Sequence, residues 1–367
     1  MCKMKTPSEI FFRIIPAHFR SLLGVCLSVV EMRGSEWFRN EVLDMCLSRK
    51  GGGIDYPDVE GMDWGRKHIA LPARYTYLFR NADVSLEMGR CAAGCKWISE
   101  SFGHSVNVPC EVFPLRVFGC FFRLIGRNKK LPDNGGLGYV YCRGDGYFHF
   151  VAESLVSLLY SLRFKEMASV VVVKSHYERF PYFKQYIELL KKNGKIRDVI
   201  EVDTDFIQAP NYVMTAYEFD AGVVCRQSVD LLRDALLPKD YVVVARRIFL
   251  TRRGRRCFDN QDALEKIAKQ NGFEVIDTDG MSVEKQINLF REANVVVSNH
   301  GAGLTNMIYM KPGGRIVELF SSKWRNDCYF RLSAVMEHKY SCLSAGKTKG
   351  WGKINECSFD SLLKSVV

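Results

Sequence analysis

From residue 139 onward, apolar and polar positions follow periods that predict regular secondary structure. Short runs of β-branched residues predict buried strands, whereas apolar residues three and four apart predict helices. The helix predicted at residues 147–163 has one apolar face, formed by Phe148, Val151, Ala152, Leu155, Leu158, Leu159 and Leu162. This first alternation comprises strands at residues 139–142, 169–173, 198–202 and 212–216, with helices at 147–163 and 182–193.

A second alternation begins after a connecting helix predicted at residues 223–237. It comprises strands at residues 248–251, 273–277, 294–298 and 315–320, with helices at 259–270, 282–292, 304–310 and 358–367. Pro238, Lys239 and Asp240 form the predicted linker between the two alternations. Two such alternations predict two doubly wound α/β lobes that face a cleft.

The predicted domain boundaries follow from these elements. Residues 1–237 form the first lobe, in which residues 1–110 are an elaborated extension without an assigned order of elements. Residues 238–350 form the second lobe. Residues 351–367 form a terminal helix, for which packing back on the first lobe is one option.

The stretch at residues 294–320 joins a strand, a glycine turn, a helix and a second strand. Its turn is His300-Gly301-Ala302-Gly303. In a parallel sheet, such a turn places free backbone N–H groups and a helix N-terminus at the carboxyl edge of the strands. That arrangement favours an anion site, usually for phosphate, and an ordinary tight turn is the alternative.

The composition is that of a globular protein, with 47% hydrophobic and 25% charged residues among 367. The formal net charge of +11 favours an anionic partner, namely a nucleic acid, an acidic membrane surface or a phosphorylated substrate. Thirteen scattered cysteines suit free thiols in a reducing compartment better than a disulfide framework. Cys91 and Cys95 have no second pair at zinc-finger spacing, so no metal site is predicted.

No apolar run reaches the roughly 18–20 residues that span a bilayer. The first 23 residues interleave apolar side chains with four basic ones, Lys3, Lys5, Arg13 and Arg20. A basic amphipathic element of this kind suits peripheral contact with an anionic membrane. An ordinary helix docked on the protein core is the alternative.

Four arginines surround Gly254 directly after the strand predicted at residues 248–251, namely Arg252, Arg253, Arg255 and Arg256. Arginine stays charged and binds phosphate oxygens through two N–H groups at once. This cluster and the glycine turn both follow strands of one predicted sheet, so we expect them at one edge. Together they predict a diphosphate site, with a solvated basic loop as the alternative.

His149 and Glu153 lie four residues apart on the helix predicted at residues 147–163, and Asp145 lies in the preceding turn. Side chains at i and i+4 share a helix face. A histidine or carboxylate at a helix start beside a cleft suits a general base, and a surface ion pair is the alternative. Glu318, near the end of its strand, is predicted to accept both hydroxyls of a ribose.

Several familiar motifs are absent from the sequence, including a Walker P-loop, a strict G-x-G-x-x-G, a nucleophile elbow and HExxH. Asp-x-Asp patterns at residues 203–205 and 277–279 resemble metal motifs of some sugar-nucleotide enzymes. Two such matches in a chain with 41 acidic residues carry little weight.

The chain resembles the family 61 glycosyltransferases over about residues 139–322. The resemblance rests on IFLTRR at 248–253, the Ser-x-x-x-Gln-Ile helix at 282–287, NHGAGLTNMIYMKPGGRIVELF at 299–320 and, upstream, GYFHFVAES at 146–154. It implies a GT-B architecture, with two Rossmann-like lobes and the donor held mainly by the second. It also implies inverting transfer from a nucleoside-diphosphate sugar, often UDP-xylose or UDP-N-acetylglucosamine, with no metal and no other cofactor.

The family's motifs map onto particular residues. Arg252 and Arg253 fall on its arginine pair for the diphosphate, and Gln286 falls on the helix glutamine. The implied donor-binding turn comprises His300, Gly301, Ala302, Gly303, Leu304, Thr305 and Asn306. His149 and Glu153 match a histidine and an acidic residue of the upstream run.

The candidates for the general base are Glu153, which we favour, then His149, and also Asp145. Two departures from the family pattern are Gly146, where relatives commonly have Asn, and Lys285, where they commonly have Glu. The first departure affects the acceptor side, and the second is expected on the surface.

We therefore predict an inverting glycosyltransferase that acts on a hydroxyl of a surface glycan of capsule or lipopolysaccharide type, free or lipid-linked. We expect it in the cytoplasm, peripheral at the inner face of the cell membrane. One rival is a nucleotide-dependent oxidoreductase on a Rossmann-like sheet. The other is a basic nucleic-acid-binding protein, which predicts a steep salt dependence of affinity; on the favoured reading no nucleic acid is bound.

Overall fold

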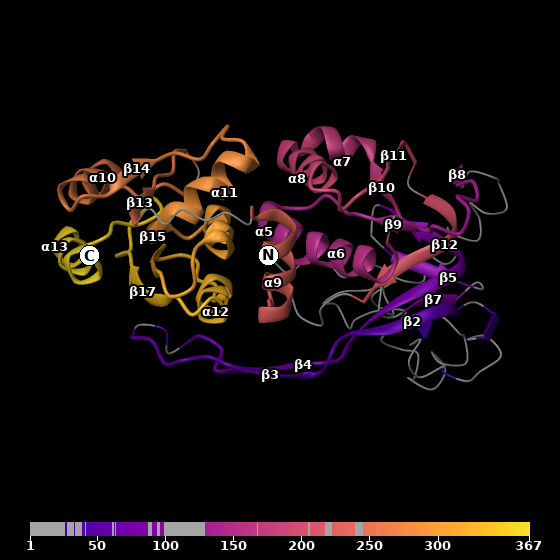
Figure 1. The fold of residues 1–367 in the computed structure, drawn as a ribbon. Coiled ribbons are helices and arrows are strands. Elements are labelled where there is room, and N and C mark those ends of the chain that lie inside the picture. Colours follow the sequence, from indigo (N-terminus) through magenta and orange to yellow (C-terminus); the bar gives the residue numbers. More distant parts are fainter. Residues whose placement is uncertain are drawn as a thin grey trace. The chain divides into compact units, whose positions relative to one another are not determined.

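The structure is a computed structural model that describes residues 26–27, 33, 39–40, 42–60, 62, 64–86, 90–93, 96–98, 129–166, 168–204, 206–216, 222–238, 245–254 and 256–367. The amphipathic N-terminal segment, Cys95, Arg255 and most of the predicted linker lie outside the described residues. The chain divides into two compact units (Figure 1). Unit 1 comprises Met1–Gly51 and Pro72–Ala221, and unit 2 comprises Gly52–Leu71 and Gly222–Val367.

Unit 1 is built on one mixed sheet with the strand order β1-β7-β6-β5-β12-β9-β10-β11. Strand β2 pairs with β5, and β8 pairs with β12. The strands are β1 (Cys26–Leu27), β2 (Val42–Arg49), β5 (Arg74–Ser85), β6 (Arg90–Ala93), β7 (Lys96–Ile98), β8 (Lys129–Lys130), β9 (Tyr139–Tyr141), β10 (Ser169–Val173), β11 (Val199–Val202) and β12 (Phe206–Thr215). The helices are α5 (Tyr147–His149), η2 (Phe150–Ser154), α6 (Leu155–Phe164), α7 (Lys174–Arg179) and α8 (Pro181–Lys192).

The parallel half of this sheet matches the predicted α/β alternation. Strands β12, β9, β10 and β11 are parallel neighbours, and all five residues of β10 are buried, as its four valines predict. The other half is mostly antiparallel, because β5 pairs with β12, β6 and β2 in that sense, whereas β1 and β7 are parallel. The sheet is therefore doubly wound only in part, and the extension at residues 1–110 supplies its antiparallel strands.

The helix predicted at residues 147–163 is confirmed as one helical stretch, with a difference in its middle. Between α5 and α6, the segment Phe150–Ser154 is a π-helical turn rather than an α-helix. All five of its residues are buried, including Glu153. Such turns are rare in proteins overall, and those that occur often lie at functional sites.

Unit 2 is built on a parallel sheet of strand order β14-β13-β15-β16-β17. Counted along the chain, this is the doubly wound order 2-1-3-4-5, in which the direction of winding reverses between β13 and β15. The elements of the sheet layer are β13 (Arg246–Leu250), α10 (Gln261–Gln270), β14 (Glu274–Ile276), α11 (Val283–Glu292), β15 (Ala293–Asn299), η3 (Ala302–Tyr309), β16 (Arg315–Phe320), α12 (Cys328–Val335), β17 (Lys339–Ser344) and α13 (Glu356–Val366).

Helix α13 packs in the core of unit 2, beside α10 (Figure 1). Its buried side chains, Phe359, Leu363 and Val366, share an apolar cluster with Phe249 of β13 and Val297 of β15. The option that this helix packs back on the first lobe stays a prediction, while its buried face lies in the core of unit 2. The i, i+4, i+7 spacing of its apolar residues matches the sheet face of its own unit.

Unit 2 also includes two segments that the sequence assigned to the first lobe. Helix α9 (Arg226–Leu236) belongs to it, because Arg233 donates hydrogen bonds to the carbonyls of Ile308 and Met310 at 2.5 and 2.7 Å. The hairpin β3 (Gly52–Asp55) and β4 (His68–Leu71) belongs to it as well. The contacts beside that hairpin include Tyr56 with Phe330 and Trp64 with Phe320. The observed division thus falls between Ala221 and Gly222, earlier than the boundary predicted after residue 237.

Unit 2 should lose stability in mild acid because of His338. This side chain is buried against the carbonyl of Met307, and burial lowers its pKa to about 4. Between pH 6.5 and 4 the unfolded chain therefore binds a proton that the folded chain does not, so stability falls as pH falls. We expect a loss of about 3 kcal/mol over this range.

Urea unfolding of the wild type and of His338→Gln at pH 7.5 and 4.5 measures this effect. Glutamine keeps a donor near Met307 but does not titrate. The variant should therefore lose about 3 kcal/mol less stability than the wild type between the two pH values. An equal loss in both proteins would remove His338 as the cause.

Candidate functional site

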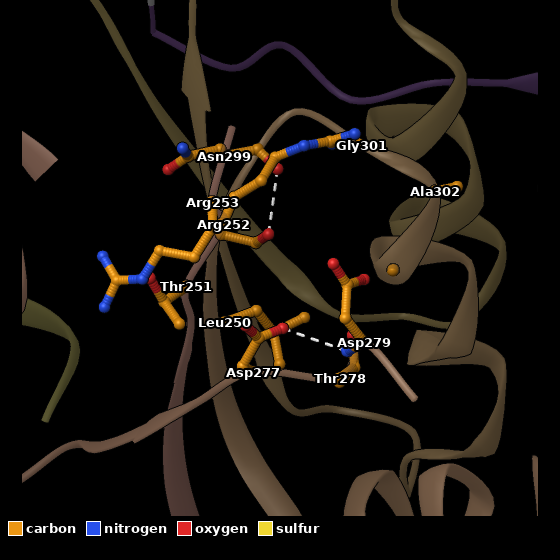
Figure 2. Close-up of a pocket in the computed structure, with 12 residues that line it drawn as sticks. Leu250, Thr251, Arg252, Arg253, Asp277, Thr278, Asp279, Asn299, Gly301 and Ala302 are labelled. Atoms are coloured by element: carbon orange, nitrogen blue, oxygen red, sulfur yellow. Dashed lines mark hydrogen bonds between the residues drawn. The ribbon is translucent and has the colours of Figure 1, made fainter. Parts of the chain in front are cut away.

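A cavity of about 270 Å³ opens at the carboxyl ends of β13, β14 and β15, all in unit 2. It thus lies where the winding of the sheet reverses, which is where doubly wound sheets bind ligands. Figure 2 shows its lining residues. They are Leu250, Thr251, Arg252, Arg253, Asp277, Thr278, Asp279, Ser298, Asn299, Gly301, Ala302 and Gly303.

Arg252 and Gly301 form the cationic side of the cavity. A Cβ built on Gly301 would lie 2.1 Å from Nη1 of Arg252, so a side chain there would overlap the guanidinium. Glycine is needed for this close approach and not for its dihedral angles, since its φ of 174° is ordinary extended backbone. Figure 2 shows the Arg252 guanidinium beside Gly301. The sequence therefore places a charged fork directly against the glycine turn, as predicted for these two residues.

The helix after the glycine turn is a 3-10 helix, η3, rather than the predicted α-helix. Its first residues, Ala302 and Gly303, line the cavity together with Gly301. The next three residues, Leu304, Thr305 and Asn306, are fully buried and do not line it. The prediction that these three side chains contact the donor is corrected, because η3 turns them into the core of unit 2.

Asn306 and Gln286 bind each other instead of facing the cavity. Asn306 Nδ2 donates to Gln286 Oε1 at 2.8 Å, and Gln286 Nε2 donates to the Met281 carbonyl at 2.9 Å. The first of these bonds joins α11 to η3, and the second joins Gln286 to the residue before the Ser282 cap. Ser282 caps α11 through its hydroxyl, which accepts from the Lys285 N–H, and serine is a favoured residue at this position. The role of Gln286 in the structure is thus to hold the glycine turn in place.

Arg253 is largely committed to an acidic partner. Its guanidinium binds Glu265 at 2.7 Å (Nη1 to Oε1) and 2.9 Å (Nη2 to Oε2). Burial raises the pKa of the Glu265 carboxyl, but hydrogen bonds from Thr251 and Arg253 outweigh it, so the pKa is lowered overall. In Figure 2 the Arg253 side chain extends away from Gly301. Of the predicted arginine pair, Arg252 is therefore the one directed at the glycine turn.

Glu318 is fully buried, which corrects its predicted role as a ribose contact. One carboxylate oxygen binds His300 Nδ1 and the other accepts from Tyr340 Oη at 2.5 Å. Glu318 instead orients His300, whose ring is also packed against Phe320 with centroids 5.5 Å apart.

The remaining wall of the cavity is formed by residues that sequence reasoning did not select. Asp277 and Asp279 are exposed at the end of β14, and Asp277 Oδ1 accepts from the Asp279 N–H at 3.0 Å. Their Asp-x-Asp pattern was considered only as a metal motif. Their position could have identified them as candidates. They directly follow the strand next to β13, where acidic residues bind ribose in related sheets.

Asn299 ends β15, two residues before Gly301, and supplies a buried acceptor on the glycine-turn side of the cavity. Its side chain is 2% exposed, and Nδ2 donates to Gln261 Oε1 at 3.0 Å. Its Oδ1 has no hydrogen-bond partner among the described residues. A buried polar atom without a partner is costly, so this oxygen suits a donor from a ligand.

The predicted acid–base residues lie in unit 1, and two of them are paired. His149 Nδ1 and Glu153 Oε1 are 3.1 Å apart. The imidazole is 45% exposed, whereas the Glu153 side chain is 10% exposed. The hydrogen bond that His149 donates to Glu153 raises the pKa of His149 above 6.5, with burial opposing it and the charges of Glu153 and Asp145 adding to it.

Asp145, in the turn before α5, accepts a hydrogen bond and forms a long ion pair through its carboxylate. Its carboxylate accepts from the Gly146 N–H at 2.7 Å and lies 3.9 Å from Arg143 Nη2. It also contributes to the raised pKa of His149. Of the two paired residues, His149 is therefore the one accessible to solvent, whereas Glu153 is nearly buried.

The described residues contain neither a metal-binding cluster nor a membrane-spanning helix. No group of three or more His, Cys, Asp or Glu side chains within the described ranges is arranged to hold a metal ion. In the same part of the chain, no helix is both long and apolar enough to cross a bilayer.

Comparison with known proteins gives three similarities. The sequence model of the family Glycosyltransferase 61 matches residues 147–317, a range that includes His149, Glu153, Arg252 and the glycine turn but neither Asp145 nor Glu318. A rice protein (Oryza sativa subsp. japonica), beta-1,2-xylosyltransferase RCN11, is 26% identical over 156 residues. That match covers 37% of this chain and 29% of the rice protein.

Among solved structures, the chain is similar to TibC, an iron-containing dodecameric glycosyltransferase of enterotoxigenic E. coli H10407. The identity is 11%, and the match covers 82% of this chain and 86% of TibC. The TM-score of 0.33 is too low to support an argument about shared geometry.

Proposed function

Because the sequence model of Glycosyltransferase 61 matches residues 147–317, we propose that this chain transfers a sugar from a nucleoside-diphosphate sugar to a hydroxyl group. The observation that carries the proposal is the contact between the Arg252 guanidinium and the Gly301 backbone. It gathers a fixed cation and the N–H groups of a glycine turn at the switch point of a parallel sheet. A diphosphate is the ligand that such donors fit.

The opposite wall of the cavity supports a ribose. Asp277, at the end of β14, offers carboxylate oxygens to the 2′ and 3′ hydroxyls, while Asn299 Oδ1 offers a further acceptor on the glycine-turn side. Glu318 has no such role. We propose a UDP-linked sugar, with xylose tested first because the rice relative is named a beta-1,2-xylosyltransferase, and N-acetylglucosamine tested second.

For the chemistry, we propose inversion with His149 as the general base and Glu153 as the residue that orients it. The exposed imidazole takes the proton from the acceptor hydroxyl, whose oxygen attacks the anomeric carbon. The bond from that carbon to the diphosphate oxygen breaks, and Arg252 stabilises the departing charge. This ranking reverses the preference for Glu153 as base, since Glu153 is nearly buried behind His149.

No metal is required in this scheme, because Arg252 and the backbone N–H groups supply the positive charge that a cation would otherwise supply. The proposed acceptor is a glycan or lipid-linked saccharide of capsule or lipopolysaccharide type. We propose that the chain meets it at the inner face of the cell membrane. The nucleotide-dependent oxidoreductase and the nucleic-acid-binding protein have no support among the similar proteins.

Thermal shifts with nucleotides and nucleotide sugars in EDTA test the proposal. We expect UDP, UDP-xylose and UDP-N-acetylglucosamine to raise the melting temperature, and NADH, NADPH and short oligonucleotides to leave it unchanged. The same assay compares UDP with 2′-deoxy-UDP in the wild type and in Asp277→Asn. The wild type should prefer UDP by about tenfold, and the variant should lose most of this preference because a charged acceptor is gone.

Two outcomes would count against these assignments. Stabilisation by NADH alone, or by no nucleotide, contradicts the transferase proposal. Stabilisation by UDP with an undiminished ribose preference in Asp277→Asn keeps the transferase and removes Asp277 from the ribose site.

A further inference from the structure

Arg256 occupies an unusual position at the end of the arginine cluster. Its φ of 69° lies in the left-handed region, which costs a non-glycine residue energy and is found disproportionately at functional sites. Its guanidinium carbon lies 4.9 Å from the ring centroid of Trp324 and 6.0 Å from that of Trp351. Within the described ranges, this guanidinium has no hydrogen bond and no carboxylate partner. Two indole rings therefore position a cation whose N–H donors remain available.

Trp324 presents an aromatic surface next to this cation. It is 42% exposed, which is uncommon for tryptophan, and it follows β16 at the carboxyl edge of the sheet. Its ring meets the edge of the His300 ring at 4.6 Å, and Glu318 holds that histidine in turn. The His300 ring thus supports one side of the indole, while another part of the indole stays exposed to solvent.

This pair of residues, which we call the Arg256–Trp324 shelf, lies beside the nucleotide cavity in the same unit. Asn299, which lines the cavity, donates from Nδ2 to the Arg256 carbonyl at 3.5 Å. The Arg256 loop and the cavity wall are therefore connected by a direct contact. A molecule on the shelf would lie next to a nucleotide in the cavity.

The surroundings of the shelf are positively charged. Lys323, Arg325 and Lys349 are exposed, and Lys323 Nζ donates to the Lys349 carbonyl at 2.8 Å, which joins the loops after β16 and β17. None of these three cations has a carboxylate partner among the described residues. Asp259 is the acidic residue found here, and its carboxylate accepts from the Trp351 N–H at 3.2 Å.

We propose that the Arg256–Trp324 shelf binds a saccharide that carries a carboxylate or phosphate group. An exposed indole suits the apolar C–H face of a sugar ring, and a pre-positioned guanidinium binds a carboxylate or phosphate through two N–H groups. Its role as the acceptor subsite rests on the proposed transferase function. Binding to the shelf does not, so the two proposals are tested apart.

The geometry favours a sugar over other anionic partners. Single-stranded nucleic acids are bound by several aromatic rings along a basic groove, and each ring stacks on one base. The shelf offers one exposed indole beside one guanidinium, with the second indole behind it. This arrangement fits one acidic ring rather than a long chain of phosphates.

Calorimetric titration without nucleotide tests the shelf with three tetrasaccharides. They are tetragalacturonate, its neutral methyl ester, and a tetramannoside that carries one phosphate. We expect at least one acidic tetramer to bind about tenfold or more tightly than the neutral ester. Arg256→Gln should abolish this preference, and Trp324→Ala should weaken every tetramer that binds.

Lys339→Gln is the matched control, because Lys339 is exposed at the amino end of β17 and its loss removes the same charge from the opposite edge of the sheet. This variant should bind as the wild type does. The proposal is overturned if Arg256→Gln or Trp324→Ala binds as the wild type does, or if Lys339→Gln loses as much affinity as Arg256→Gln. Tighter binding of a thymidine tetranucleotide or of phosphatidylglycerol vesicles, with the same dependence on Arg256, also overturns it.

A UDP titration of the same preparations separates this proposal from the transferase function. Normal UDP binding by a protein that ignores acidic saccharides overturns the shelf alone. Binding of acidic saccharides by a protein that ignores UDP overturns the nucleotide site and leaves the shelf.

Discussion

Replacing His149 with alanine is expected to lower kcat/KM by about 10²–10⁴-fold, the usual contribution of a positioned general base. The affinity for UDP should stay unchanged, because the UDP contacts proposed above lie in unit 2. His149 is the accessible member of its pair with Glu153, and its ring is 45% exposed. Steady-state rates with a saturating donor, together with a UDP titration, measure the two effects separately.

The pH dependence of Glu153→Gln identifies which residue is the base. Glu153 raises the pKa of His149 by its hydrogen bond and its charge. Protonated His149 cannot accept a proton, so kcat/KM should fall as pH drops through that raised pKa. Without the Glu153 charge the pKa of His149 falls, and the acid limb of the profile should move to lower pH.

Asp145→Asn is the graded control, since Asp145 contributes a smaller part of the same pKa shift. It should move the acid limb in the same direction by less. A Glu153→Gln enzyme that is inactive at every pH, while His149→Gln retains activity, would make Glu153 the base instead.

Replacing Arg252 with alanine should weaken UDP binding by about 10–100-fold, the usual effect of losing charge-assisted hydrogen bonds. Transfer should suffer as well, because the same cation stabilises the departing diphosphate. Gly301→Ala should also weaken UDP binding, although the charge of Arg252 is retained. Its new methyl group would lie 2.1 Å from Nη1 of Arg252, so the guanidinium must move away from the glycine turn.

Much of the fold of unit 2 follows from sequence periodicity. Continuous β-branched runs predict β15 and β16, and the Ser282 cap predicts the start of α11. The antiparallel half of unit 1 could not be predicted in this way. Strand β5 pairs with strands both near and far along the chain, and its partners depend on long-range contacts that local patterns do not encode.

The candidate site was predictable in its glycine turn and only in part elsewhere. Arg252 and Arg253 are adjacent in the sequence, but they have different partners in the structure. Arg253 binds Glu265 on helix α10, and local sequence patterns do not predict that contact. Glu318 is buried against His300 and Tyr340 in unit 2, so burial replaced the expected ribose contact. Asp277 was overlooked because its role depends on β14 lying next to β13.

The relation between the two lobes remains a prediction. Unit 2 has the doubly wound architecture expected of it, whereas unit 1 has it only in the parallel part of its sheet. The GT-B arrangement with a cleft between the lobes is what the proposed chemistry requires. His149 in one unit and Arg252 in the other must both reach one sugar during transfer. A doubly labelled protein with one probe on each unit would show whether UDP and acceptor bring the units together.

The central claim is that the cavity of unit 2 binds the diphosphate of the donor through Arg252 and the glycine turn. Titration of UDP in EDTA into the wild type, Arg252→Ala, Gly301→Ala and the charge control Lys339→Gln tests it most directly. The account predicts saturable binding by the wild type and by Lys339→Gln, with losses of about tenfold or more in the other two. Absence of UDP binding by the wild type, or equal binding by all four proteins, would contradict it.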